Sequence, residues 1–317
     1  MQAAMTDMFR PIPFPLLASD PKAFAEAIGA SFRETGFAVI SDHPVPDETI
    51  TAANAAAAAF FALPSEAKAK YDDRENGGQR GYTAFGAENA KGKAEADQKE
   101  FWHTGRAAAP GSGLEDIMRP TPAVPEVPGF DGATRALYDA LDEMGRQILH
   151  AIAIHLGLEE DWFDEKVATG NSILRLLHYP PQKTPPPEGS VRAGAHEDIN
   201  VITLLLGAEE AGLQVKHRSG KWLDINPPAG ALVINCGDML QRLTGGVLPS
   251  TTHRVLNPTA ERAAFPRYST PFFLHFAPGV LIEPLPQCLA EGGTAFEPIT
   301  AQDYLMERLR EIGLVRS

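Results

Sequence analysis

The sequence predicts a protein of mixed α and β structure, in which N-terminal helices and a C-terminal helix flank a core of short strands. Three observations support this prediction. Before about residue 170 apolar residues recur at helical spacing, and after it short apolar segments alternate with glycine and proline turns. Near the C-terminus the helical spacing returns. Many short strands at close spacing indicate a sandwich, a barrel or a jelly roll, and the gaps are too short for the crossover helices of a parallel sheet.

The composition is that of an ordinary globular protein, with 44% hydrophobic and 22% charged residues. The 317 residues allow one large domain or two ordinary ones. The net charge is −13, and no run of five or more Lys or Arg occurs. Neither nucleic acid nor an anionic membrane is therefore an expected partner. The chain has two cysteines, Cys236 and Cys288, no apolar segment of membrane-spanning length and no basic-then-apolar leader. We therefore expect a cytoplasmic location.

The N-terminal part opens with a predicted helix between Asp20, which has the form of an N-cap before proline, and Gly36. The buried stripe of this helix consists of apolar residues four positions apart: Phe24, Ile28 and Phe32. A short buried strand is predicted over 37–40, followed by an alanine-rich helix over 51–63 and a further helical turn at Pro64.

Between residues 76 and 113 the periodicity is lost, while glycine, lysine and aromatic residues accumulate. Long irregular segments of compact proteins are usually functional loops or disordered, and aromatic residues argue against disorder. We predict a partly packed loop that could close over a site. Its candidates for substrate contact, for each of which a structural role stays open, are Arg80, Tyr82, Phe101 and Trp102.

A long helix with an apolar face from Leu137 to Ile152 is predicted to end near Gly157. The strands expected after it are 173–179, 201–206, 213–215, 231–235, 253–256 and 268–276. The C-terminal helix begins at Thr300-x-x-Asp303, which has the form of a capping box. Its buried face is expected to contain Leu305, Leu309 and Ile312.

A pair of residues in the second half has the spacing of metal ligands. His196 and Asp198 are separated by one residue, so in an extended strand both point to the same face while Glu197 points away. Together with the distant His253 they could form the 2-His-1-carboxylate triad of non-haem Fe(II) oxygenases. His-x-Asp is common by chance, so the spacing alone leaves a site without metal open.

A second pair with the same spacing, Arg267 and Ser269, stands at the start of the last predicted apolar strand. A guanidinium fork and a hydroxyl on one face suit the binding of a carboxylate. A solvated strand end or a surface ion pair is the alternative interpretation. No dinucleotide fingerprint, Walker loop or nucleophile elbow is present, so these classes of enzyme have no support.

Several segments form an ordered set of motifs: 211–215, 228–244, 250–255 and 267–269. This set strongly resembles the isopenicillin N synthase-like family of Fe(II)/2-oxoglutarate-dependent oxygenases. The resemblance covers roughly residues 173–276, and residues 12–71 also resemble the N-terminal helical region of that family. It implies a double-stranded β-helix, also called a jelly roll. We expect an N-terminal helical region over 1–130 and a jelly-roll core with its C-terminal helix over 131–317, forming one integrated catalytic unit.

By this resemblance the ligands of Fe(II) are His196, Asp198 and His253. The residues that bind the co-substrate 2-oxoglutarate are Arg267, Ser269 and Tyr179. The resemblance implies oxidation of a small-molecule C–H bond by O2, with hydroxylation expected and with succinate and CO2 released. Desaturation and ring closure stay open. Many family members have Asn where this chain has Leu177, so one polar contact is expected to be missing.

Two alternatives and two structural interpretations complete the expectations. The first alternative is a 2-oxoglutarate-independent oxidase of the isopenicillin N synthase type, which the absence of a glutamine in residues 312–317 disfavours. The second is a non-catalytic jelly-roll protein that binds a small acid. Asn235-x-Gly237-Asp238 is predicted to be a structural turn, with Cys236 as a small packed residue. The sequence does not identify the primary substrate, and a monomer or weak oligomer is expected.

Overall fold

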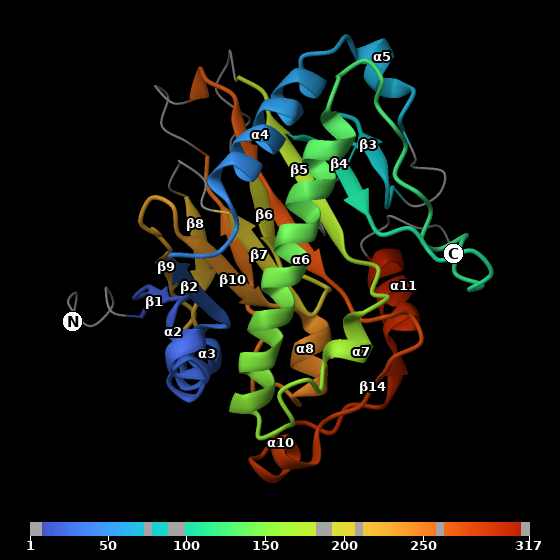
Figure 1. Cartoon of the computed structure of the whole chain (residues 1–317). Helices are drawn as coiled ribbons and strands as arrows, with labels where there is room; N and C mark the ends of the chain where they lie inside the picture. The colour runs from blue at the N-terminus through green and yellow to red at the C-terminus, as the bar shows by residue number, and fades with distance from the viewer. Residues whose placement is uncertain are drawn as a thin grey trace.

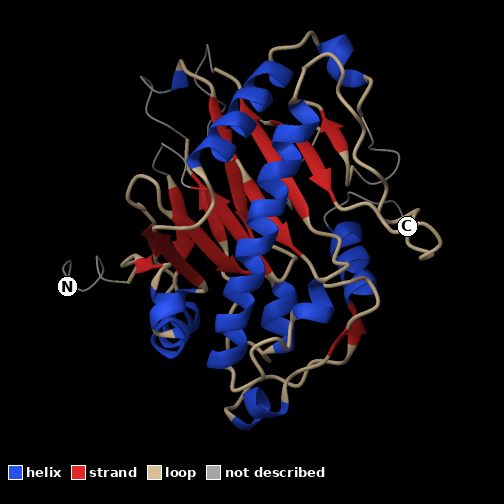
Figure 2. Cartoon of the chain, in the orientation of Figure 1, coloured by secondary structure: helices blue, strands red, loops and turns tan. Residues whose placement is uncertain are grey.

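The computed structural model describes residues 8–72, 78–87, 99–181, 192–206, 212–257 and 263–311. Its centre is a large sheet, one face of which is crossed by helices, with a smaller sheet nearby (Figures 1 and 2). In these segments the large sheet has nine strands, with β12 paired to β5 outside the order β1-β2-β10-β7-β13-β5-β4-β3, and the smaller sheet has the order β6-β11-β8-β9. No helix in the described segments is both long and apolar enough to cross a membrane.

The strands of the large sheet are β1 (Ile12–Pro13), β2 (Phe37–Ser41), β3 (Gly81–Thr83), β4 (Glu100–Gly105), β5 (Ile173–Tyr179), β7 (Ile202–Leu206), β10 (Leu232–Cys236), β12 (Arg267–Ser269) and β13 (Pro271–Leu274). Those of the smaller sheet are β6 (Ala193–His196), β8 (Leu213–Lys216), β9 (Trp222–Asp224) and β11 (His253–Val255). A separate pair is formed by β14 (Leu281–Ile282) and β15 (Ile299–Thr300). Apart from β1 with β2, the neighbouring strands of both large and small sheets pair antiparallel, as the short gaps predicted.

The helices are α2 (Leu16–Ser19), α3 (Pro21–Thr35), α4 (Asp47–Phe61), α5 (Ser65–Ala69), α6 (Phe130–His155), α7 (Asp164–Val167), α8 (Asp238–Leu243), α10 (Pro286–Ala290) and α11 (Ala301–Glu311). Figure 1 shows α4 and α6 crossing the same face of the large sheet. Helix α6 comes close enough that a Cβ at Gly145 would lie 2.5 Å from Leu274 Cδ1. The prediction of a jelly-roll core flanked by helices is confirmed.

The large sheet has two apolar faces, because successive side chains of a strand belong alternately to two hydrophobic clusters, one under the helices and one on the inner face towards the smaller sheet. In β2, Ala38 and Ile40 pack with the helices in the main core, whereas Phe37 and Val39 point inward. Successive side chains of a strand point to opposite faces, which explains this division. The inner cluster also contains Val215 of the smaller sheet, so the two sheets face each other across it.

The helices predicted from the sequence are present, and two of them begin earlier than the apolar pattern indicated. Asp20 caps α3 by accepting a hydrogen bond from Ala23 N at 3.0 Å, and Gly36 ends it with a φ of 74°. Helix α4 begins at Asp47 and α6 at Phe130, since their first turns contain acidic residues that favour a helix N-terminus without adding to the apolar stripe.

At the C-terminal helix, Thr300 and Asp303 form the predicted capping box, in which Asp303 N donates to Thr300 Oγ1 at 3.1 Å. Leu305 and Leu309 are buried as expected. Ile312, like the whole C-terminal end over 312–317, lies outside the described residues.

The prediction of an irregular loop over 76–113 is wrong for part of this segment. Strands β3 and β4 lie there, and β4 pairs with β5 from Glu100↔His178 to Gly105↔Ile173. Trp102 is fully buried in the helix-side core and Tyr82 packs there too, which makes both structural. Six residues whose two faces are both buried give no polar–apolar alternation, so the strand was not evident. Residues 73–77 and 88–98 of this segment lie outside the described residues.

Candidate functional site

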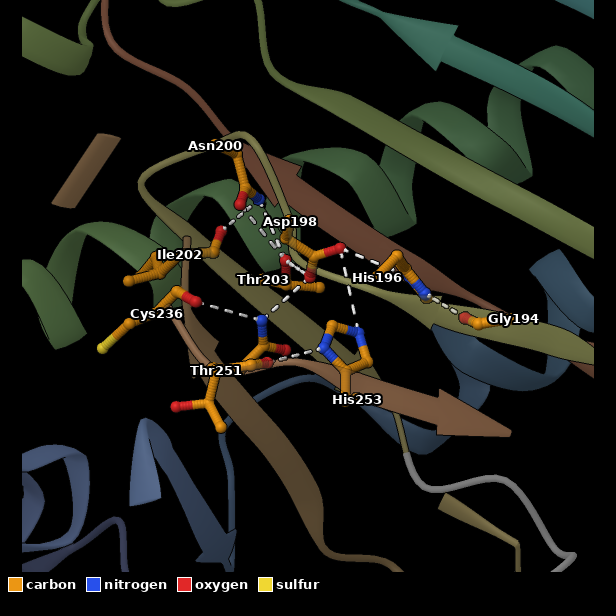
Figure 3. Close-up of polar contacts among 10 residues, drawn as sticks. Gly194, His196, Asp198, Asn200, Ile202, Thr203, Cys236, Thr251 and His253 are labelled. Atoms are coloured by element: carbon orange, nitrogen blue, oxygen red, sulfur yellow. Dashed lines mark hydrogen bonds and ion pairs between the residues drawn. The ribbon is translucent and has the colours of Figure 1, made fainter. Parts of the chain in front are cut away.

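Three side chains converge where the smaller sheet faces the large one (Figure 3). His196 ends β6 and His253 begins β11, and the two residues are direct partners in the antiparallel register. Asp198 follows two residues after His196. The ligand atoms of the three residues all lie within 4.8 Å of one another. His196 and Asp198 therefore share a face as predicted, although Asp198 lies beyond the end of the strand.

The hydrogen bonds of the two histidines direct both Nε2 atoms to the same point. Nδ1 of His196 lies 2.7 Å from Gly194 O, and Nδ1 of His253 lies 3.1 Å from Thr251 O. A carbonyl oxygen only accepts, so each Nδ1 carries the hydrogen and each Nε2 presents a lone pair. The two Nε2 atoms lie 3.8 and 3.9 Å from the same oxygen of Asp198, Oδ1 (Figure 3).

The second oxygen of Asp198 is bound by residues of the large sheet. Thr203 Oγ1 donates to Asp198 Oδ2 at 2.6 Å, and Asn235 Nδ2 donates to the same oxygen at 2.8 Å. Asn200 in turn donates to Thr203 Oγ1 at 3.0 Å. These bonds leave Oδ1 directed at the histidines (Figure 3). Glu197 instead accepts a hydrogen bond from the Thr252 hydroxyl and is exposed.

The electrostatics of the site favour a neutral His196 and an ionised Asp198. The pKa of His196 is lowered to about 4. The largest cause is the partial removal of water from its imidazole by the surrounding groups, although 47% of the side chain is exposed, and the second is the neighbouring His253 ring. Burial acts to raise the pKa of Asp198, but both histidines and the bonds from Asn235 and Thr203 together lower it. Neutral imidazole and carboxylate are the forms that bind a metal ion.

The donor set fits a divalent ion. Bonds from His nitrogen and Asp oxygen to a metal such as Zn²⁺ are about 2.0–2.2 Å long, so two donors on one ion lie at most about 4.4 Å apart. The two nitrogen–oxygen separations of 3.8 and 3.9 Å are within this limit. Two histidines with one carboxylate are also the donor set of non-haem iron oxygenases.

The three residues predicted to bind a carboxylate lie together on one strand pair. Arg267 pairs with Tyr179 and Ser269 pairs with Leu177, between β12 and β5. The guanidinium carbon of Arg267 lies 5.2 Å from the centre of the Tyr179 ring. Arg192, from the segment just before β6, lies 5.5 Å from the same ring. All of these side chains are buried, which is the environment in which an Arg–carboxylate contact is strong.

Sequence reasoning missed Thr203 and Asn235 as partners of the triad. Asn235 was predicted to belong to a structural turn. It instead lies within β10, two residues after the inward-facing Val233, and therefore points to the same inner face. A polar residue at an inward position of an apolar strand was the available signal, and Thr203 in β7 has the same character. Cys236 faces the other way and is a buried apolar contact, as expected.

Of the four loop candidates, only Phe101 lies on the inner face, next to Leu177 and Tyr179. Arg80 is part of the framework, since it donates to Asn171 Oδ1 at 2.7 Å and to backbone carbonyl groups.

Comparison with known proteins places these features in a family context. Residues 170–276 match the family model of the 2OG-Fe(II) oxygenase superfamily, and residues 12–126 match that of the non-haem dioxygenase in morphine synthesis N-terminal region. A 2-oxoglutarate-Fe(II) type oxidoreductase of Emericella nidulans is 33% identical over 290 residues, which is 88% of this chain and 82% of the relative.

Two solved structures are similar over nearly their whole length. A 2OG-Fe(II) oxygenase family protein from Caulobacter crescentus is 52% identical with a TM-score of 0.89, covering 96% of this chain and 99% of that one. A full-length Neurospora crassa protein in complex with alpha-ketoglutarate (2-oxoglutarate) and thymine is 30% identical with a TM-score of 0.84, covering 96% of this chain and 97% of that one.

Proposed function

The chain belongs to the 2OG-Fe(II) oxygenase superfamily, and from this premise we propose that His196, Asp198 and His253 are its iron ligands. The protein is an Fe(II)- and 2-oxoglutarate-dependent oxygenase, as its sequence predicted. The main support for the ligand assignment is the convergence of two Nε2 lone pairs and one carboxylate oxygen on one point. Three ligands on one face leave positions open for a co-substrate and oxygen.

We propose that Arg267, Ser269 and Tyr179 bind the distal carboxylate of 2-oxoglutarate, with Arg192 as a further cation beside Tyr179. The guanidinium forks match a carboxylate, and low exposure strengthens the contact because water does not compete. When bound, iron would activate O2, which is the oxidant: two of the electrons would come from 2-oxoglutarate, giving succinate and CO2, and two from the C–H bond of the substrate. This chain's residues supply the fixed donor geometry and the orientation of both substrates.

The relatives favour 2-oxoglutarate over the alternative of an oxidase that needs no co-substrate. Several are named 2-oxoglutarate-dependent dioxygenases, and the Neurospora crassa structures contain alpha-ketoglutarate. The Neurospora crassa protein also binds thymine and 5-formyluracil. We propose a small molecule as the primary substrate here, and a nucleobase is one candidate.

We further propose that the chain acts as one integrated unit, as a monomer or weak oligomer, in the cytoplasm. A single apolar core contains residues of both the N-terminal and the jelly-roll parts, for example Phe24 and Leu232. Both cysteines are buried free thiols, which suits a reducing compartment.

Two anaerobic titrations test the assignment. Fe(II) binding should be lost in His196→Ala, Asp198→Ala and His253→Ala, while His150→Ala on α6 should bind like the wild type. Addition of 2-oxoglutarate to the iron-loaded protein should then produce the visible charge-transfer absorption of the chelate, and Arg267→Gln should weaken it. Unchanged Fe(II) binding in His196→Ala would contradict the ligand assignment.

A turnover assay tests the co-substrate. Succinate release and oxygen uptake are measured with and without 2-oxoglutarate, with thymine as a first substrate. Both should depend on 2-oxoglutarate. Oxygen uptake with substrate but without 2-oxoglutarate would favour the oxidase.

A further inference from the structure

His275 lies on the inner face of the large sheet, directly after β13. The pairing of β13 with the segment before β7 continues to this point, since Val201 N donates to Leu274 O at 2.9 Å. Leu274 and Phe276, on either side of His275, belong to the main core under the helices. Successive side chains of an extended chain point to opposite faces, so His275 points inward, to the side of the proposed iron site.

The strand register and the local charges place His275 near the proposed iron site. Phe273, two residues earlier on the same face, pairs with Thr203, whose hydroxyl donates to Asp198 Oδ2 at 2.6 Å. Two residues of a strand span about 7 Å. The charge of Asp198 is also close enough to act on the pKa of His275. A small molecule at the proposed iron site can therefore reach this ring.

The backbone of His275 is fixed by the segment before β5. His275 N donates a hydrogen bond to Ser172 Oγ at 3.1 Å, and both residues are buried. A Cβ at Gly170 would lie 2.0 Å from His275 O, so the two backbone segments are in close contact. These contacts hold the residue in place through its main chain and leave its ring nitrogens uninvolved.

One nitrogen of the ring is buried without a hydrogen bond. Only 7% of His275 is exposed, and its Nδ1 has no hydrogen-bond partner within the part of the chain that the structure describes. Buried polar atoms are nearly always paired, because an unpaired one costs free energy. An apolar side chain would avoid this cost, so the polar ring points to a partner that comes from outside the chain.

The ring is uncharged near neutral pH, which limits the kind of partner. Burial lowers the pKa of His275 to about 4; Asp198 opposes this shift and Arg80 adds to it. A neutral imidazole offers one donor and one acceptor but no charge. A charged group beside it would lose its water without gaining a counter-charge from the ring. The guanidinium of Arg80 already donates to Asn171 Oδ1 at 2.7 Å and to three backbone carbonyl groups.

We infer that His275 determines substrate specificity by forming a hydrogen bond with an uncharged polar group of the primary substrate, an amide or a hydroxyl. The inward position beside Asp198 and the unpartnered Nδ1 together support this role. The inference rests on the proposed function, because the substrate reacts only where iron and 2-oxoglutarate are bound.

A matched pair of flat probes tests the inference. Benzamide and benzoate differ in having an amide or a carboxylate on the same ring, and thymine supplies a ring amide. Calorimetric titration of the full-length protein, loaded anaerobically with Fe(II) and 2-oxoglutarate, measures the Kd of each probe. The wild type should bind benzamide or thymine more tightly than benzoate.

The main variant is His275→Phe, which keeps a flat ring without polar atoms. It should weaken binding of the neutral probe roughly 5- to 30-fold, the effect of losing one neutral hydrogen bond. Benzoate affinity should not change. His275→Asn keeps a polar group and should retain more affinity for the neutral probe than His275→Phe.

Controls separate this role from a structural one. His150→Phe on α6, whose Nε2 lies 2.8 Å from Asp164, should bind all probes like the wild type. The affinity for Fe(II) should be the same in His275→Phe and the wild type, whereas a ring that only supports the fold would change Fe(II) and probe binding together. Thermal midpoints identify variants that do not fold, and His275→Leu replaces His275→Phe if the latter fails.

The outcomes distinguish this inference from the function on which it rests. Equal affinity for the neutral probe in His275→Phe and the wild type would overturn it and would mean that water alone meets Nδ1. So would benzoate binding as tightly as both neutral probes, or no binding of either neutral probe. Failure of the wild-type protein to bind Fe(II) and 2-oxoglutarate anaerobically would instead overturn the proposed function, and the inference with it.

Discussion

Asn235 donates a hydrogen bond to Asp198 Oδ2 at 2.8 Å across 37 positions of sequence, and so joins the inner face of β10 to the segment after β6. With Thr203 bound to the same oxygen, the carboxylate has one oxygen held by the large sheet and the other directed at two imidazoles. The proposed ligand geometry is therefore set by strands that contribute no ligand themselves.

Removal of the Asn235 amide should weaken iron binding. In Asn235→Ala the apparent Kd for Fe(II) is expected to rise roughly 10- to 100-fold, the usual effect of losing a group that orients a metal ligand. Anaerobic titration measures this change. Asn54→Ala, on the exposed side of α4, is the control and should bind Fe(II) normally. Wild-type affinity in Asn235→Ala would show that Thr203 alone orients the carboxylate.

A close backbone approach beside Asn235 gives a second prediction. A Cβ at Gly237 would lie 2.1 Å from Asn200 O and 2.3 Å from its Oδ1, although the φ of −102° suits any residue. Gly237→Ala should therefore push away the segment after Asp198, costing about 1–3 kcal/mol of unfolding free energy and lowering iron affinity. Urea denaturation and Fe(II) titration measure both effects.

The control for that variant is Gly132→Ala in α6, where a Cβ would have no neighbour within 4 Å. It should be neutral or raise stability by up to about 1 kcal/mol, since alanine favours helix. Equal stability of the two alanine variants would contradict the role of close approach at Gly237.

A buried ionic cluster joins the helices to the edge of the large sheet. Glu100 accepts hydrogen bonds from Lys68 Nζ at 2.7 Å, from the Tyr82 hydroxyl at 2.5 Å, and is 2.7 Å from Nδ1 of His178. Glu100→Gln leaves the Lys68 charge buried without its counter-ion, so it should cost about 3–5 kcal/mol of stability. Urea denaturation of Glu100→Gln against Glu100→Gln/Lys68→Met tests this, because removing both charges should recover part of the loss.

The same cluster predicts a pH dependence. Burial tends to raise the pKa of Glu100, but the bonds from His178, Lys68 and Tyr82 together lower it from its ordinary value of 4.5. The unfolded chain then binds more protons than the folded protein just below pH 4.5, so this contribution is present above that pH and is lost as the pH falls through the lowered pKa. The stability difference between wild type and Glu100→Gln should shrink over this acid range. A difference that stays constant from neutral pH into the acid range would contradict the prediction.

The sequence by itself determined the mixed class of fold and the order of most of its elements, and its motifs, through their resemblance to a family, indicated the jelly roll and the proposed ligands. Helical spacing, short apolar segments and helix caps are local signals, and the His-x-Asp and Arg-x-Ser pairs each depend only on the period of a strand. These features were therefore visible without knowledge of which strands are neighbours.

Only the tertiary structure decided which residues act together across the sheets. The contacts of Asn235 and Thr203 with Asp198, and of His275 with Ser172, depend on antiparallel pairing between strands distant in sequence. Strand β4 was missed for a related reason, because both of its faces are buried and its pairing with β5 joins residues far apart in the sequence. Local periodicity records which way a side chain points, whereas strand register determines what it meets.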